Sequence, residues 1–154
     1  MEPRASTPLR RLDALEKLNA AGIPAGVLVC PVIPGLTDTE IPAILEAAAH
    51  AGAKFAGYNL LQLPYANKEL FMEWLDANFP EKAAKVESKV RQMRGGKLYD
   101  ADFGQRMTGT GPFAQQIGGL FKIARRKAGI PTRGPQLSTA SFRRPIEGQL
   151  ELFD

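Results

Sequence analysis

Thiols, imidazoles and long apolar runs are scarce in this sequence of 154 residues. Its one cysteine, Cys30, excludes an internal disulfide and fits a reducing cytoplasm. The longest apolar runs, as at 27–30, fall far below the ~20 residues that span a bilayer. The first four residues, Met1 to Arg4, form no hydrophobic signal region, so we do not expect secretion. These absences favour a cytoplasmic protein that has no membrane partner.

Cysteine and histidine, which often serve in catalysis and metal binding, occur once each. Cys30 alone cannot supply the several thiolates of an iron–sulfur cluster, and its place among apolar strand residues predicts a buried core thiol. The only histidine, His50, falls near the expected end of a helix, which is typical of a surface residue. We therefore predict no catalytic residue and no metal ligand among them.

The net charge of +4 is unevenly distributed. From Arg91 to Arg144 there are eleven Lys or Arg residues against only Asp100 and Asp102, a local balance of 11 − 2 = +9. A block of this kind attracts a polyanion, so nucleic acid is a candidate partner. A solvated helical face followed by a basic tail explains the same charges equally well. The candidate nucleic-acid-binding residues are Lys122, Arg125, Arg126 and Lys127.

Residues 8–64 have the pattern helix, strand, helix, strand. Thr7 is a candidate N-cap for the first helix, in which leucines recur every three residues at 9, 12, 15 and 18. The segments 25–33 and 55–63 are apolar nearly end to end, which predicts parallel strands covered on both faces. Pairing should loosen around Pro31, because proline donates no ladder hydrogen bond. Asp38 or Thr39 is expected to cap the second helix.

The pattern changes after Pro64. Apolar residues at helical spacing predict three further helices, the last at about 113–128, and residues beyond 130 show no sustained periodicity. The Gly-Thr-Gly-Pro run at 109–112 is interpreted as a loop-to-helix transition, because no strand precedes it and no Lys-Ser/Thr follows it. The expected organisation is an α/β part over 1–65, a helical extension over 66–130 and a basic, mostly irregular tail over 131–154.

Ligands of parallel α/β folds bind at the carboxyl ends of the strands, here 31–35 and 60–64. Both segments lack a nucleophile, a base or a metal ligand. They suit a flat apolar group such as adenine, held by backbone hydrogen bonds. Ordinary strand ends closed by prolines are the alternative.

Five segments resemble radical S-adenosylmethionine proteins, in the branch related to spore photoproduct lyase and DNA repair photolyases. They are MEPRASTP at 1–8, AGIP…PVIPGLTD within 21–38, GYNLLQLP at 57–64, GGKLYD at 95–100 and FGQRMTGTGPFA at 103–114. The CxxxCxxC loop that holds the family's 4Fe-4S cluster is absent. The chain therefore resembles the second half of such a protein, and the resemblance implies a missing N-terminal half, with Met1 as a fragment boundary or an internal start.

The resemblance further implies that both strands belong to a partial (β/α) barrel and that the complete protein uses S-adenosylmethionine and a 4Fe-4S cluster. Pro34 and Gly35 would pack on the adenosyl group, and the backbone at Leu61 and Leu63 would approach the adenine. The resemblance places two more residues, Glu2 and Arg4, near the mouth of the barrel. The chain alone is expected to be inactive.

The last residues carry a second signal. The run from Gln149 to Phe153 resembles the QLxLF peptide by which bacterial DNA-maintenance proteins bind the sliding clamp. Gln149 would hydrogen-bond at a pocket rim, while Leu150, Leu152 and Phe153 would enter apolar grooves. A tail that folds back onto the domain is the alternative. The leading hypothesis is the C-terminal part of a radical S-adenosylmethionine enzyme acting on nucleic acid, and the alternative is a non-catalytic adaptor between nucleic acid and the clamp.

Overall fold

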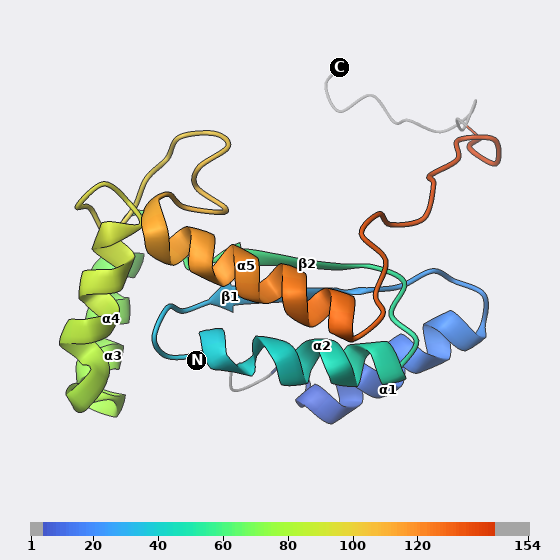
Figure 1. Cartoon of the computed structure of the whole chain (residues 1–154), viewed down its shortest axis with the longest axis horizontal. Helices are drawn as coiled ribbons and strands as arrows, with labels where there is room; N and C mark the ends of the chain where they lie inside the picture. The colour runs from blue at the N-terminus through green and yellow to red at the C-terminus, as the bar shows by residue number, and fades with distance from the viewer. Residues whose placement is uncertain (1–4, 144–154) are drawn as a thin grey trace, which may run out of the picture.

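The computed structural model describes residues 5–143, which form a mixed α/β structure (Figure 1). The predicted class, two parallel strands with flanking helices and a helical extension, is confirmed. Within 131–143 there is no helix or strand. In chain order the elements are α1 (Pro8–Ala20), β1 (Val27–Val32), the 3-10 helix η1 (Asp38–Glu40), α2 (Ile41–His50), β2 (Ala56–Leu60), α3 (Asn67–Asn78), α4 (Pro80–Gln92) and α5 (Gly111–Lys127).

Helix α1 begins as predicted, with Thr7 accepting a hydrogen bond from the Arg10 backbone N–H at 3.5 Å. The expected leucine stripe is only half correct. Leu15 is buried and Leu12 packs against the core, but Leu9 is 78% exposed and Leu18 is 42% exposed. A spacing of three residues drifts by about 60° per step on an α-helix, so leucines at 9 and 18 point in opposite directions.

The two strands pair in parallel, with Val27 beside Ala56 and Val29 beside Tyr58. The register shifts between Val29 and Val32, so the predicted loosening around Pro31 is confirmed. Both strands are shorter than the apolar runs that predicted them. Neither Asp38 nor Thr39 caps α2, because both lie within η1, which precedes that helix.

One face of the sheet is covered and the other is open. Helices α1, α2 and α5 share a core with the covered face. On the other face Leu28 is 59% exposed and the Cys30 thiol is exposed as well. The predictions of a strand covered on both faces and of a buried Cys30 were therefore wrong. Continuous apolarity shows that a strand is suited to burial on both faces, but within the described residues no element packs on the second one. The members of the core around the covered face include Leu15, Val29, Val32, Ile41, Leu45, Ala48, Leu60, Ile117, Phe121 and Ala124.

Helices α3 and α4 form a second core at the end toward which both strands point (Figure 1). Their apolar faces meet Ile33 and Leu63, which follow the two strands. Helix α5 then returns along the sheet and packs against α2, so the helical extension contributes to both ends of the structure (Figure 1).

Within residues 5–143 no helix has the length and hydropathy of a membrane span.

Candidate functional site

The carboxyl ends of the two strands meet, as parallel pairing requires. The Leu61 backbone N–H donates to the Val32 carbonyl oxygen at 3.0 Å, just past the last paired residues. The segments 33–35 and 61–63 therefore lie side by side. We refer to these two segments as the carboxyl edge.

The residues expected to contact the adenosyl group, through side chains at Pro34 and Gly35 and through backbone at Leu61 and Leu63, are mostly buried at this edge. Pro34 is fully buried, and Leu61 and Leu63 are 7% and 3% exposed within the second core. Gly35 is half-buried. A ligand at the carboxyl edge would therefore contact Gly35 and Gln62, which are half-buried, rather than the three buried residues.

Backbone groups at the edge differ in availability. Leu61 is fully engaged, because its N–H donates to Val32 and its carbonyl oxygen accepts from Arg94 Nη2 at 2.9 Å. The N–H and C=O groups of Gln62 and Leu63 make no hydrogen bond among residues 5–143. Of the adenine contacts implied by the resemblance, Leu61 has both backbone groups engaged, and Leu63 has unpaired backbone groups on a residue that is only 3% exposed.

The turn after β1 is held by its own side chains. Thr37 Oγ1 accepts from the Ile33 N–H at 2.9 Å, and Asp38 Oδ1 accepts from the Gly35 N–H at 3.0 Å. Gly35 has φ +83°, in the region that favours glycine. Asp38, expected to cap a helix, instead stabilises this turn at the edge.

A lysine from α4 lies against the same turn. A Cβ placed on Gly35 would lie 3.3 Å from Lys89 Cδ and 3.4 Å from Lys89 Nζ. The ammonium also stands 5.2 Å from the centre of the Phe113 ring. No carboxylate of residues 5–143 is within ion-pair distance of it. Lys89 thus places a half-buried positive charge at the carboxyl edge, suited to an anionic group.

Arg94, which was not among the predicted site residues, is 3% exposed at this edge. Its guanidinium donates to the carbonyl oxygens of Leu61 and Gln105, both at 2.9 Å. Burial lowers the pKa of Arg94, and the nearby Asp100 carboxylate partly opposes that shift. An arginine before Gly95-Gly96 carries no sequence signal of burial. Its charge, counted in the basic block, is not available to a polyanion.

The four candidate nucleic-acid-binding residues lie in the C-terminal part of α5. Lys122, Arg126 and Lys127 are exposed, whereas Arg125 is half-buried and donates to Thr132 Oγ1 at 3.2 Å. This end of α5 is the one away from α3 and α4 (Figure 1). Cations in a last helical turn also favour the helix dipole, so their presence there has a structural reason too.

No group of His, Cys, Asp or Glu within 5–143 could hold a metal ion. Six predicted site residues lie outside the described residues. They are Glu2, Arg4, Gln149, Leu150, Leu152 and Phe153.

The chain is similar to uncharacterized proteins of Mycobacterium tuberculosis and Mycobacterium bovis. Each match is 32% identical over 94 residues, which is 60% of this chain and 28% of the relative. The match thus spans little more than a quarter of the curated relatives' length. No family model matches the chain, and no solved structure matches it.

Proposed function

We propose that this chain is the C-terminal part of a radical S-adenosylmethionine enzyme that acts on DNA or another nucleic acid in the cytoplasm. The observation that carries the proposal is the one-sided sheet, with α2 and α5 on one face and an open second face. In a (β/α) barrel the helices surround the strands, whose inner faces line the interior. A two-stranded slice of a barrel has this arrangement, and its interior face is exposed when the other strands are missing.

The length of the relatives supports the same proposal. Because 94 matched residues are 28% of each relative, those proteins hold further chain that could supply more strands and helices. The resemblance of 57–64 and 103–114 to the radical S-adenosylmethionine branch supplies the family.

The two cofactors fit this chain differently. The 4Fe-4S cluster does not, because the sequence has a single thiol. S-adenosylmethionine fits the carboxyl edge, where the half-buried Gln62 offers unpaired backbone groups and Lys89 offers a cation for a carboxylate. When bound in the complete enzyme, that cofactor supplies a hydrogen-abstracting radical. This chain's part is to orient the cofactor and exclude water.

Isolation of the native polypeptide tests the proposal. An antibody against the 154-residue chain is used to purify the endogenous protein or complex anaerobically, followed by mass spectrometry and iron analysis. We expect a longer chain or a tight partner, a 4Fe-4S cluster, and release of 5′-deoxyadenosine from S-adenosylmethionine under reducing conditions. The recombinant 154-residue chain, reconstituted with iron and sulfide, is the control and should retain none. A native 16.7 kDa protein without iron or partner would overturn the proposal.

Nucleic-acid binding is tested separately. Converting Arg125, Arg126 and Lys127 to Gln should weaken binding of a single-stranded oligonucleotide and flatten its salt dependence, by a slope of about 0.7 for each phosphate that is no longer neutralised. A matched triple variant neutralises Arg10, Lys82 and Lys85, which are exposed on α1 and α4. Equal reductions in affinity for both variants would mean that only net charge matters.

A second candidate function, the adaptor between nucleic acid and the sliding clamp, has the terminal QLELF run at 149–153 in its favour. It requires no cofactor. Clamp binding together with a native chain free of iron would favour the adaptor over the enzyme.

A further inference from the structure

The loop between α4 and α5 is fixed against the carboxyl edge. The Met107 carbonyl oxygen accepts from the Leu60 N–H at 2.9 Å, and the Thr110 N–H donates to the Met93 carbonyl oxygen at 3.1 Å. Arg94 holds the Gln105 carbonyl oxygen at 2.9 Å. These long-range hydrogen bonds fix residues 105–110 beside the end of β2.

This anchored loop presents an aromatic ring to solvent. Phe103 is 92% exposed, and the Arg106 guanidinium lies 5.4 Å from the centre of its ring. A single exposed apolar side chain is common on protein surfaces. Here a guanidinium lies within cation–π distance of the ring, on a loop whose backbone is anchored at the edge. A flat ring and a flat cation together are the groups that stack with unpaired bases.

The charges of the loop favour stacking over phosphate binding. Lys97 and Arg106 are balanced by Asp100 and Asp102. The exposed cations Lys122, Arg126 and Lys127 lie instead toward the other end of α5. Helix α5, whose 17 residues make it about 25 Å long, connects the loop to its basic end. A single strand whose phosphates are held at the basic end would therefore have to extend along α5 over several nucleotides to reach the carboxyl edge.

We infer that Phe103 and Arg106 form a stacking platform for an unpaired base of single-stranded nucleic acid, delivered to the carboxyl edge while Lys122, Arg126 and Lys127 hold phosphates of the same strand. This inference rests on the proposed function, because it places the base beside the edge where the radical would form. It adds the residues that contact the base and the single-stranded form of the substrate.

The test measures binding of a labelled oligonucleotide of about twelve nucleotides, long enough to span both sites, to the full 154-residue chain. Phe103→Ala should weaken binding by about 5- to 150-fold, the range for removal of one base stack, and leave the salt slope unchanged. Phe103→Trp should preserve affinity. Leu9→Ala removes another exposed apolar side chain, 78% accessible on α1 and outside the basic block of 91–144, and should have no effect. Circular dichroism checks that each variant is folded.

The outcomes separate this inference from the proposed function. If Phe103→Ala binds as tightly as the unaltered chain while the Arg125, Arg126 and Lys127 triple variant binds weakly, the platform is refuted and the nucleic-acid proposal stands. A weaker affinity in Phe103→Ala that Phe103→Trp does not restore also refutes stacking. If the unaltered chain binds no oligonucleotide, both the platform and the nucleic-acid part of the proposed function fail. The iron analysis of the native protein then remains the test of whether it is a radical S-adenosylmethionine enzyme.

Discussion

Arg94 Nη2 donates to the Leu61 carbonyl oxygen at 2.9 Å across 33 positions of sequence. Through Nη1 the same guanidinium holds Gln105. The Arg94 side chain, just after α4, therefore joins the carboxyl end of β2 to the loop that carries Phe103. The geometry of the candidate site depends on this junction, although Arg94 itself has no surface from which to contact a ligand.

Replacing Arg94 by Ala should lower the free energy of unfolding by about 2–4 kcal/mol, because two carbonyl oxygens in a largely buried site lose their donor. Urea denaturation followed by circular dichroism measures the decrease. Arg94→Lys should recover only part of it, since an ammonium lacks the planar fork that reaches both acceptors.

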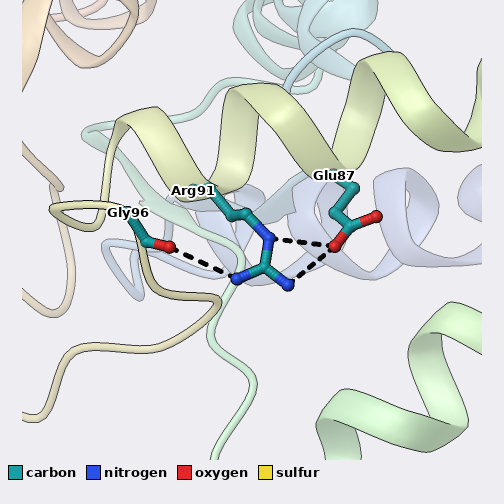
Figure 2. Close-up of polar contacts among 3 residues, drawn as sticks. All are labelled: Glu87, Arg91 and Gly96. Carbon is teal, nitrogen blue, oxygen red and sulfur yellow. Dashed lines mark hydrogen bonds and ion pairs between the residues drawn. The ribbon is translucent and has the colours of Figure 1, made fainter.

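The matched control for this prediction is Arg91, one helical turn away. Arg91 pairs with Glu87 at 2.8 Å and donates to the Gly96 carbonyl oxygen at 3.3 Å (Figure 2). This cluster is solvent-accessible, so Arg91→Ala should cost only about 0.5 kcal/mol. Equal decreases in stability for the two alanine variants would contradict the role assigned to Arg94.

Two adjacent glycines in α5 make a second prediction possible. A Cβ on Gly119 would meet no atom within 4 Å, whereas a Cβ on Gly118 would lie 3.0 Å from the Tyr58 hydroxyl oxygen. Gly119→Ala should therefore raise the free energy of unfolding by about 0.5–1 kcal/mol through helix propensity alone. Gly118→Ala should stabilise less or destabilise, because Tyr58 is packed against Phe121 at 4.7 Å and cannot move freely.

Removing the opposing hydroxyl isolates the cause. In the Tyr58→Phe background, Gly118→Ala should stabilise about as much as Gly119→Ala does. Thermal unfolding of the four variants completes the cycle. A Gly118→Ala penalty that persists without the hydroxyl would locate the conflict elsewhere in the α5 packing.

The open face of the sheet has a chemical reporter in Cys30. Because the thiol is exposed, iodoacetamide should modify it in the folded chain at a rate close to that in urea, as followed by mass spectrometry. Cys30→Ser is the control for labelling elsewhere. In the longer native protein we expect Cys30 to be protected, because further barrel strands would cover this face. Protection in the isolated chain would instead mean that another part of this chain covers it.

Local periodicity was sufficient to predict most helices and their buried sides. Apolar residues at helical spacing are buried in both α2 and α5, at Ile41, Leu45 and Ala48 in the first and at Ile117 and Phe121 in the second. These positions depend only on the 3.6-residue repeat and on one covered face per helix. The proline at position 31 likewise predicts the local interruption of regular strand pairing.

The failures concern contacts between distant segments. Apolarity around Cys30 cannot reveal whether a second layer is present in the same chain. The burial of Arg94 follows from two carbonyl oxygens, one of them 33 residues away and the other 11. Phe103 has no periodic neighbours to mark it as exposed. Each of these features is set by tertiary placement, which neither spacing nor composition encodes.

The C-terminal peptide supplies the last prediction, and it depends on no other part of the chain. A peptide covering 144–154 should bind a bacterial sliding clamp, with its apolar anchors carrying most of the affinity, as interface hot spots do. Leu152 and Phe153 to Ala together should abolish measurable binding in a fluorescence-polarisation assay, because both side chains would no longer bury apolar area in the groove. Glu151→Ala is the control and should change the affinity little, since position x of QLxLF faces solvent. A wild-type peptide that does not bind, or a double variant that still does, would remove the clamp from the partners of this protein.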